Sequence, residues 1–549
     1  MDPRRPNSRE HRRQAIDAEI KSLEESLRVL KHRRNALAPI SSLPTEVLDT
    51  IFLFARHGVT VSTSSATPGK KTDPLSWLRV SHVCHQWREI ALNQPLFWNH
   101  VNFATLSSAG ASKILARAKR ALLYLEAKVF GNHWDDARYE VFEKKLQACI
   151  SRTCHLYIRA NLGDLLGTLE CLVSPAPILE TLSLSTKLFP HPPDFPETLF
   201  GGAAPKLSCL EIHNYGFTWK SPLLKGLRNL KICLSSKDNT MPSLSVWLDA
   251  LHEMPQLTML TLHEASPMAS SFPFVVKRIV TLPSLTHLDI ANSPRDCGFA
   301  LAHLELPALS CLCLEPSFLT LDGDDVEEVL PYIVRHANTQ PLQSMLIQGD
   351  NIRIKILAWP VPDIDGEVHE PHSSPTATPP AQVTLSIRNK NWIPFDRHPE
   401  FIGTVMAALP LDDLVTLVVR GFGSPQYQRF WHHNSFTWPL LRRVRLTSVE
   451  ATRFTDWLLK DKGGDENPLL PSLEELVLVN AQLDGRRTRR LCRALMKRVK
   501  QGVPLRMLDL RSCSPDPANP GAVQLLSDIV VNVLCPEETR DARAQIRYI

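Results

Sequence analysis

A short pattern, Pro-x-Leu-x-x-Leu-x-Leu, recurs along most of the chain and limits its fold more than any other feature. Clear copies begin at Pro177, Pro205, Pro255, Pro283, Pro307, Pro439, Pro471 and Pro504. Weaker copies with aliphatic substitutions begin at Leu227, Leu342, Gln382 and Leu414. Successive copies start 20 to 40 residues apart, which is the spacing of one structural repeat unit. The chain of 549 residues can therefore form one long repetitive body rather than a series of separate domains.

Each copy of this pattern predicts one short strand that is not stable by itself. Successive residues of a strand point to opposite faces, so the spaced leucines enter one core and the residues between them face outward. One copy cannot bury its leucines alone, whereas stacked copies bury them together. The irregular, often long period is typical of leucine-rich repeats. We therefore expect an α/β leucine-rich-repeat solenoid, shaped as a horseshoe, over residues 150–549.

One segment inside this region interrupts the pattern. Residues 361–380 contain many Pro, Ser, Thr, Asp and His residues, and such a composition is typical of surface loops. Because the pattern resumes on both sides, we interpret the segment as a loop that extends from one repeat and not as a domain boundary.

The residues between the leucines would form the concave surface of such a solenoid. They carry both signs of charge, which favours a protein or peptide ligand and argues against nucleic acid. We therefore predict that this surface binds an unknown target protein. The candidate target-binding residues are Glu211, His213, His263, His287, Asp289, Glu315, Arg443, Arg445, Asp509 and Arg511.

Residues 1–38 predict a charged helix with an apolar seam. The seam, interrupted only by Arg34, has spacings of 4, 3, 4, 3 and 7 residues, a heptad pattern formed by Ile16, Ile20, Leu23, Leu27, Leu30 and Leu37. An exposed seam on a single helix needs a partner. The pattern is compatible with a helix that folds back on its own domain, a coiled coil between two chains, or a partly ordered arm.

The next segment, residues 39–100, predicts a small all-helical module. Ser42 and Pro44 are suited to start a helix from Glu46 to Phe54, because serine caps helix N-termini and proline fits the first turn. Val47, Leu48, Ile51 and Phe52 would form its apolar face.

The module continues after a polar stretch. Residues 56–74 are rich in Ser, Thr, Gly and Lys and predict an inserted, exposed loop. A second amphipathic helix is predicted over residues 77–91, and residues 95–98 close the module. Residues 101–149 connect this module to the repeats and carry a candidate first, degenerate repeat.

Together these segments resemble an F-box. The resemblance rests on four features in order: the Leu43-Pro44 opening, the helix 46–54, the segment Val80-Ser81-x-Val83-Cys84-x-x-Trp87-Arg88-x-Ile90-Ala91, and the closing Leu96-Phe97-Trp98. The lead-in at residues 33–40 also resembles the F-box-like proteins of mushroom-forming fungi.

The resemblance implies that the module binds the Skp-type adaptor of a cullin ubiquitin ligase complex, while the repeats act as the substrate adaptor. The implied adaptor-binding residues are Leu43, Pro44, Val47, Leu48, Ile51 and Phe52, with Val80, Val83 and Trp87 shared between module core and interface. The loop 56–74 interrupts a motif that is usually compact. A second interpretation is therefore open, in which the chain is a protein-interaction scaffold outside any ligase that uses the repeats and the heptad helix.

We find no arrangement of residues that predicts chemistry, so we expect neither enzymatic activity nor a cofactor. His82-x-x-His85 has no third ligand near it in sequence, and the acidic stretch 322–328 lacks the glycine and glutamate spacing of an EF-hand. The twelve cysteines include no Cys-x-x-Cys pair. No metal site is predicted.

Net charge and hydropathy limit which classes of partner and which cellular compartment are compatible with the sequence. The net charge is only +5, which argues against a dedicated nucleic-acid binder. The basic segment 486–500 is predicted as the solvated helix of a repeat, with Leu491, Leu495 and Val499 buried. A nuclear-import signal, binding of an acidic partner and phosphate contacts are the alternatives. No apolar run is long enough for a signal peptide or a membrane span. We expect a cytoplasmic or nuclear protein.

Overall fold

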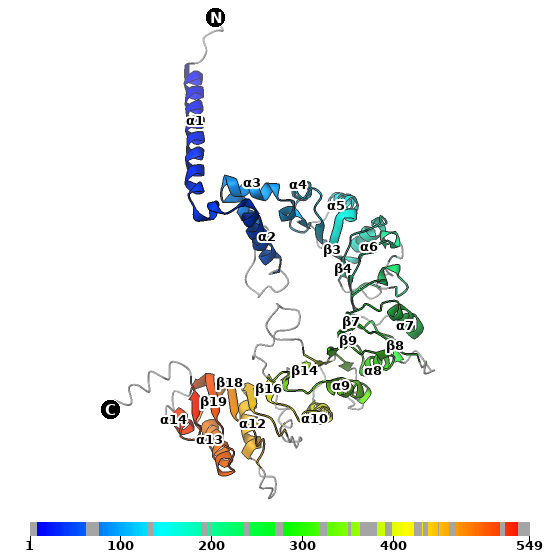
Figure 1. Cartoon of the computed structure of the whole chain (residues 1–549), viewed down its shortest axis with the longest axis vertical. Helices are drawn as coiled ribbons and strands as arrows, with labels where there is room; N and C mark the ends of the chain where they lie inside the picture. The colour runs from blue at the N-terminus through cyan, green and yellow to red at the C-terminus, as the bar shows by residue number, and fades with distance from the viewer. Residues whose placement is uncertain are drawn as a thin grey trace, which may run out of the picture. The chain divides into compact units, whose positions relative to one another are not determined.

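A computed structural model describes most of the chain, and Figure 1 shows it. The described residues are 8–61, 76–129, 136–187, 196, 199–216, 218–234, 241–269, 278–318, 327–349, 353–362, 381–389, 398–421, 431, 438–447, 449–459, 468–515 and 522–535. Most of the predicted loops 56–74 and 361–380 lie outside these residues. The chain divides into an N-terminal unit, residues 1–183 with 198–206, and a C-terminal unit, residues 184–197 with 207–549. No helix in the described part is long and apolar enough to cross a membrane.

The N-terminal unit begins with helices. The heptad pattern correctly predicts the long helix α1, and the expected short helices follow it. In chain order they are α1 (Ser8–Ala36), η1 (Pro39–Ser42), α2 (Thr45–Val61), η2 (Ser76–His82), α3 (His85–Asn93) and η3 (Pro95–Trp98). The predicted module, residues 39–100, is therefore helical up to the start of the first strand.

Strands and helices alternate in the rest of the N-terminal unit. The parallel strands β1 (His100–Asn102), β2 (Leu123–Val129) and β3 (Thr153–Ala160) lie side by side. Between and after them come α4 (Ser108–Arg117), α5 (Asp136–Cys149), η4 (Ile150–Arg152), α6 (Leu162–Cys171) and η5 (Leu199–Gly202). Strand β4 (Thr181–Thr186) spans the boundary between the two units. The strand and helix alternation therefore starts before residue 150.

The C-terminal unit contains a large, mostly parallel sheet. Its first strands follow one another in space as they do in sequence, each paired in parallel with the next: β5 (Cys209–His213), β6 (Asn229–Cys233), β7 (Met259–His263), β9 (His287–Ala291) and β11 (Cys311–Leu314). The pattern leucines alternate with partly exposed residues, as predicted; Leu210 and Ile212 of β5, for example, are fully buried. A separate parallel pair joins β8 (Val280–Thr281) to β10 (Leu304–Glu305).

The middle of this sheet differs from the sequential stacking that the repeat pattern predicts. β13 (Ser344–Gly349), β14 (Arg353–Trp359) and β15 (Val383–Asn389) form an antiparallel meander, in which β14 lies between the other two. β15 pairs with β11 and with the short β12 (Ser317–Phe318), whereas β13 pairs with β16 (Thr416–Arg420). The expectation that neighbouring copies are neighbouring strands is wrong here. A short connection can join antiparallel strands, so β14 folds back onto β13 and displaces the next copy.

The sheet is apolar on both faces at the meander. Leu346, Leu357, Trp359, Ala381 and Val418 form one buried cluster, while the alternate residues of β13 and β16 are buried as well. Strands buried on both faces read as continuous apolar runs instead of alternating ones. The polar face of the first strands is thus not continuous with that of the last ones.

The last strands return to parallel order. They are β17 (Arg443–Thr447), β18 (Glu475–Leu483), β19 (Met507–Pro515) and β20 (Asn532–Leu534), and β17 pairs with β16. Helices connect the strands and lie along one side of the sheet in Figure 1. They are η6 (Pro222–Leu224), α7 (Leu244–His252), α8 (Pro294–Ala302), α9 (Leu330–Ala337), α10 (His398–Ala408), α12 (Val449–Leu459), α13 (Gly485–Lys500) and α14 (Ala522–Ser527).

The predicted basic helix exists as α13, but its buried face differs from the prediction. Leu491 and Leu495 are buried as expected, whereas Val499 is 45% exposed and Arg498 only 3% exposed. Seven residues after Leu491, Arg498 returns to the same helix face. Its guanidinium donates to the carbonyl oxygens of Leu469, Leu470 and Leu473. These three carbonyl oxygens, rather than solvent, therefore stabilise the positive charge of Arg498.

Candidate functional site

The candidate site is the face of the helical module around α2. Leu43 leads into this helix, with its backbone N–H donating to the carbonyl of Ile40. The Pro44 carbonyl accepts from the backbone N–H groups of Val47 and Leu48 and so starts the helical pattern. Ser42 does not cap α2 as predicted; its hydroxyl donates to the Pro39 carbonyl at 2.6 Å and closes the preceding turn.

α2 has two apolar stripes that face in different directions. Leu48 and Phe52, four residues apart, are 0% and 2% exposed and enter the module core. Val47, Ile51 and Phe54, at positions i, i+4 and i+7, are 41%, 38% and 73% exposed. We call these three residues the exposed stripe of α2. A helix that keeps a second apolar stripe in solvent is typical of a docking surface.

Aromatic side chains fill the core under this helix. The ring of Phe52 lies 5.0 Å from that of Trp87, and Trp77 lies 5.1 Å from Phe97 and 5.5 Å from Trp98. The Trp98 indole N–H donates to the Ala91 carbonyl at 2.6 Å, so its polar atom is satisfied. Phe97 and Trp98, which close the module, are therefore structural.

A buried arginine joins α2 to the end of the module. Arg56, predicted to begin an exposed loop, lies inside α2 and is 2% exposed. Its guanidinium donates to the carbonyls of Leu96, Phe97 and His100 and to Asn99 Oδ1. It also lies 4.8 Å from the centre of the Trp77 ring. Burial lowers the pKa of Arg56 to about 10, so the side chain stays charged at neutral pH.

The second predicted helix is interrupted. In place of one helix over residues 77–91, a 3-10 helix ends at His82 and α3 begins at His85. Cys84 takes an extended conformation with φ −155°, and its Sγ accepts the Trp87 backbone N–H. The thiol thus acts as a helix cap. This break leaves Val83 58% exposed.

The nine predicted adaptor-binding residues fall into three groups. Pro44, Val47, Ile51 and Val83 are exposed; Leu43, Val80 and Trp87 are half-buried; Leu48 and Phe52 are buried. The buried pair therefore supports the surface and does not form it. Sequence reasoning missed Phe54, although its i+7 spacing from Val47 was the signal. It also missed Leu96, which is 47% exposed beside the buried Phe97.

The ten predicted target-binding residues lie in two groups along the C-terminal unit. Those on β5, β7 and β9, with Glu315 after β11, precede the meander, while those on β17 and β19 follow it. Several are already paired: His263 Nε2 lies 3.2 Å from Asp289 Oδ2, Arg443 Nε lies 2.6 Å from Glu475 Oε2, and Arg511 pairs with Asp509 at 2.7 Å. Glu315 pairs with Arg353 of β14. The structure brings each group together but not both into one surface.

Asp509 differs from its group because it is only 8% exposed. Burial alone would raise the pKa of its carboxyl, but hydrogen bonds from the Arg511 side chain and backbone lower that pKa below its usual value. Asp509 therefore serves to position Arg511, which is exposed.

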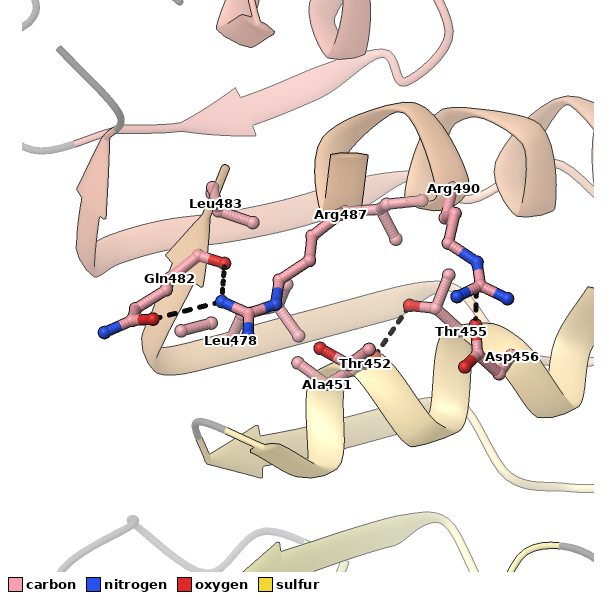
Figure 2. A pocket seen from close by; sticks show the side chains of 11 residues that line it. Ala451, Thr452, Thr455, Asp456, Leu478, Gln482, Leu483, Arg487 and Arg490 are labelled. Atoms are coloured by element: carbon pink, nitrogen blue, oxygen red, sulfur yellow. Dashed lines mark hydrogen bonds and ion pairs between the residues drawn. The ribbon is translucent and has the colours of Figure 1, made fainter. Parts of the chain in front are cut away.

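A small pocket lies between α12 and α13, and Figure 2 shows the side chains that line it. Its arginines are engaged: Arg490 Nε lies 3.1 Å from Asp456 Oδ1, and Arg487 donates to Gln482 Oε1 at 3.1 Å. An anion would have to displace these partners. The pocket therefore does not favour a phosphate site.

Comparison with protein families places one match on this chain. Residues 40–104 match the family model described as F-box-like, and F-box domains generally bind Skp-type adaptors. The matched segment holds η1, α2, η2, α3, η3 and β1. A search among curated proteins found no match to the chain.

Proposed function

We propose that this chain is the substrate-recognition subunit of an SCF-type cullin ubiquitin ligase and carries out no chemistry itself. The F-box-like module binds a Skp-type adaptor, and through it a cullin, while the C-terminal unit selects a target protein. The exposed stripe of α2, inside the matched segment, is the observation that carries this proposal.

The stripe suits an apolar partner groove. Val47, Ile51 and Phe54 present one continuous face of a helix whose neighbouring stripe, Leu48 and Phe52, is anchored in the module core. Covering apolar surface gains about 25 cal/mol per Å². A helix laid into a groove is a recurrent way to use such a face. Pro44, one turn before Val47, extends the surface.

Charging the stripe should abolish adaptor binding. The test is co-purification and affinity measurement of the full chain with a Skp-type adaptor, comparing the parent with a Val47→Asp, Ile51→Asp double variant. We expect affinity to fall by about 100-fold or more, because docking would bury two carboxylates against apolar groups.

The control is Leu122→Asp, which adds a carboxylate at a residue 49% exposed outside the matched segment. It should bind as the parent does. Amide hydrogen exchange of α2 shows whether the double variant remains folded. A parent that fails to bind the adaptor, or a folded double variant that binds normally, contradicts the proposal.

For the C-terminal unit we propose a degenerate leucine-rich-repeat solenoid that binds the target. Support comes from the eleven copies of the sequence pattern from Pro205 onward, each of which contains a strand, and from the parallel pairing of most neighbours. The meander divides its polar face, so we propose that the target contacts one of the two groups of residues and not all ten.

A second candidate function, an interaction scaffold, is favoured by α1. The seam residues Ile16, Ile20, Leu23, Leu27 and Leu30 are 48% to 64% exposed. The alternative in which α1 folds back on its own domain would bury them. We propose that a second copy of this chain covers the seam as an antiparallel coiled coil.

The spacing of the seam supports the antiparallel direction. When Leu23 is set opposite Leu27 of the second copy, Ile20 falls opposite Leu30, so the four central seam residues meet one another, whereas Ile16 falls opposite Arg34. Lys31 and Arg33 of one copy then flank Asp17 and Glu19 of the other, so opposite charges meet at the edges. The arrangement is two-fold symmetric, as most homodimers are.

Charging the seam should convert the dimer to a monomer. We expect the full chain to have the mass of a dimer by light scattering coupled to gel filtration, and a Leu23→Asp, Leu27→Asp variant to have the mass of a monomer. Val29→Asp, on the same helix but outside the seam and 43% exposed, should remain dimeric. A parent that is monomeric at every concentration contradicts the coiled coil.

A further inference from the structure

A cysteine lies between two histidines on neighbouring strands of the C-terminal unit. In the parallel register, Cys233 of β6 is the partner of His213 on β5 and of His263 on β7. Neighbouring strands are about 4.8 Å apart, so the three side chains stand in one row on the same face of the sheet. The Cys233 thiol therefore lies between the two imidazoles.

The next strand supplies a carboxylate to this row. Asp289 of β9 places Oδ2 3.2 Å from His263 Nε2. The His263 side chain is 31% exposed and that of Asp289 26% exposed, so small molecules can reach them. Thiol, imidazole and carboxylate thus follow one another on β6, β7 and β9. Such a chain orients the imidazole and favours its protonated form beside the sulfur.

The electrostatics of the row support a thiolate. Burial alone would raise the pKa of Cys233, but the interactions of its thiol with His213 and His263 outweigh burial and lower the pKa to about 7. Burial likewise acts to lower the pKa of His263, yet Asp289 and the sulfur raise it to about 10. Both shifts favour a thiolate beside an imidazolium.

Other cysteines on the same face behave differently. Burial raises the pKa of both Cys209 and Cys311 to about 11, and the nearby carboxylates of Glu211 and Asp289 add to the effect. The described charged groups on this face of β5, β6, β7 and β9 are Glu211, His213, Lys231, His263, His287 and Asp289. Among these three described cysteines, Cys233 alone is flanked by two imidazoles in its row.

Two ordinary roles for such a cluster fail. In the described part of the chain, no group of three or more His, Cys, Asp and Glu side chains could hold a metal ion. The described cysteines are free, and the residues beside Cys233 in its row are histidines, so no disulfide partner adjoins it. What remains is a half-buried thiol in an electropositive setting, which is where reactive cysteines occur.

We propose that Cys233 is a modification site, a nucleophilic thiolate that reacts with hydroperoxides and soft carbon electrophiles, with His263 and Asp289 as its positioning residues. With a hydroperoxide, the sulfur attacks one oxygen and the O–O bond breaks. The leaving oxygen takes the imidazolium proton of His263 and departs as water or an alcohol. The sulfur is oxidised by two electrons to sulfenic acid, and the peroxide is reduced.

Because the site lies among predicted target-binding residues, its modification would alter that surface. The chemistry itself does not depend on the proposed function. It can therefore be tested without an adaptor or a target.

The test is the pH dependence of alkylation of each cysteine in the full chain. Short pulses of iodoacetamide, followed by peptide mass spectrometry, give a rate for every thiol across a pH series. We expect Cys233 to reach half its maximal rate near pH 7, and Cys209 and Cys311 to react only at far higher pH. A pulse of hydrogen peroxide should make Cys233 the main residue labelled by dimedone, which traps sulfenic acid.

Variants separate activation from simple exposure. His263→Gln should move the Cys233 midpoint upward to about 8.5 or beyond, the ordinary thiol value. Asp289→Asn should move it in the same direction by less. His287→Gln, on the same face but outside the row, should leave it unchanged. If His263→Gln does not fold, the Asp289→Asn profile decides. A parent whose Cys233 reacts no faster than Cys209 at neutral pH, or a midpoint that neither variant moves, overturns the proposal.

Discussion

Replacing Arg56 with methionine should destabilise the helical module by about 2 to 4 kcal/mol. Methionine fills much of the same space but donates no hydrogen bond. The carbonyls of Leu96, Phe97 and His100 and Asn99 Oδ1 would then lack this donor in a buried setting. Each orphaned acceptor costs about 1 to 3 kcal/mol, partly recovered where water enters.

Amide hydrogen exchange of α2 in the full chain measures this loss locally, because the two units need not unfold together. Arg88→Met, an exposed arginine on α3, is the matched control and should change stability by less than about 0.5 kcal/mol. If exchange from α2 is as slow in the Arg56 variant as in the parent, the guanidinium is not what holds the module closed.

A corresponding prediction, loss of stability on replacing a buried arginine, applies to Arg498 in the C-terminal unit. Arg498→Met should destabilise α13 and the turn at residues 469–473 by about 2 to 3 kcal/mol, because three buried carbonyls lose their donor. Arg493→Met on the exposed face of the same helix removes an equal charge without this loss. Hydrogen exchange of the two segments distinguishes the variants.

The direction in which the stability contribution of Arg498 changes with pH follows from its pKa shift. Burial lowers its pKa in the folded chain to about 10, so the unfolded chain holds more protons between that value and the higher, ordinary pKa of arginine. The contribution of this group to stability therefore rises with pH across that window and does not change with pH near neutrality.

If Arg498→Met and Arg493→Met destabilise the protein equally, the loss of net charge, and not the loss of the donor to the three carbonyls, is responsible.

Much of the module was predictable because its signals are local. The heptad spacing predicted α1, and the run Val47 to Phe52 predicted α2. The two buried arginines were not predictable. A charged residue in a polar stretch or on a basic helix is predicted to be exposed to solvent. The carbonyl groups that accept its hydrogen bonds lie far away in sequence; Arg56 and Leu96, for example, are 40 positions apart.

The candidate site was recognised only in part for the same reason. Periodicity placed Val47, Leu48, Ile51 and Phe52 on α2, yet it could not separate the buried stripe from the exposed one. That separation depends on Trp87 and Phe97, which arrive from α3 and η3 and cover Phe52 but leave Phe54 in solvent.

By itself the sequence determined that the twelve pattern copies become strands and, outside the meander, which of their residues turn inward, because alternation along a strand is a property of the local backbone. Tertiary structure alone decided which strands are neighbours. The fold-back of β14 reversed the order of β13 and β15, and the parallel register set Cys233 between His213 and His263. Pairing is chosen by long-range hydrogen bonds and by a shared core, and no stretch of a few residues encodes either one.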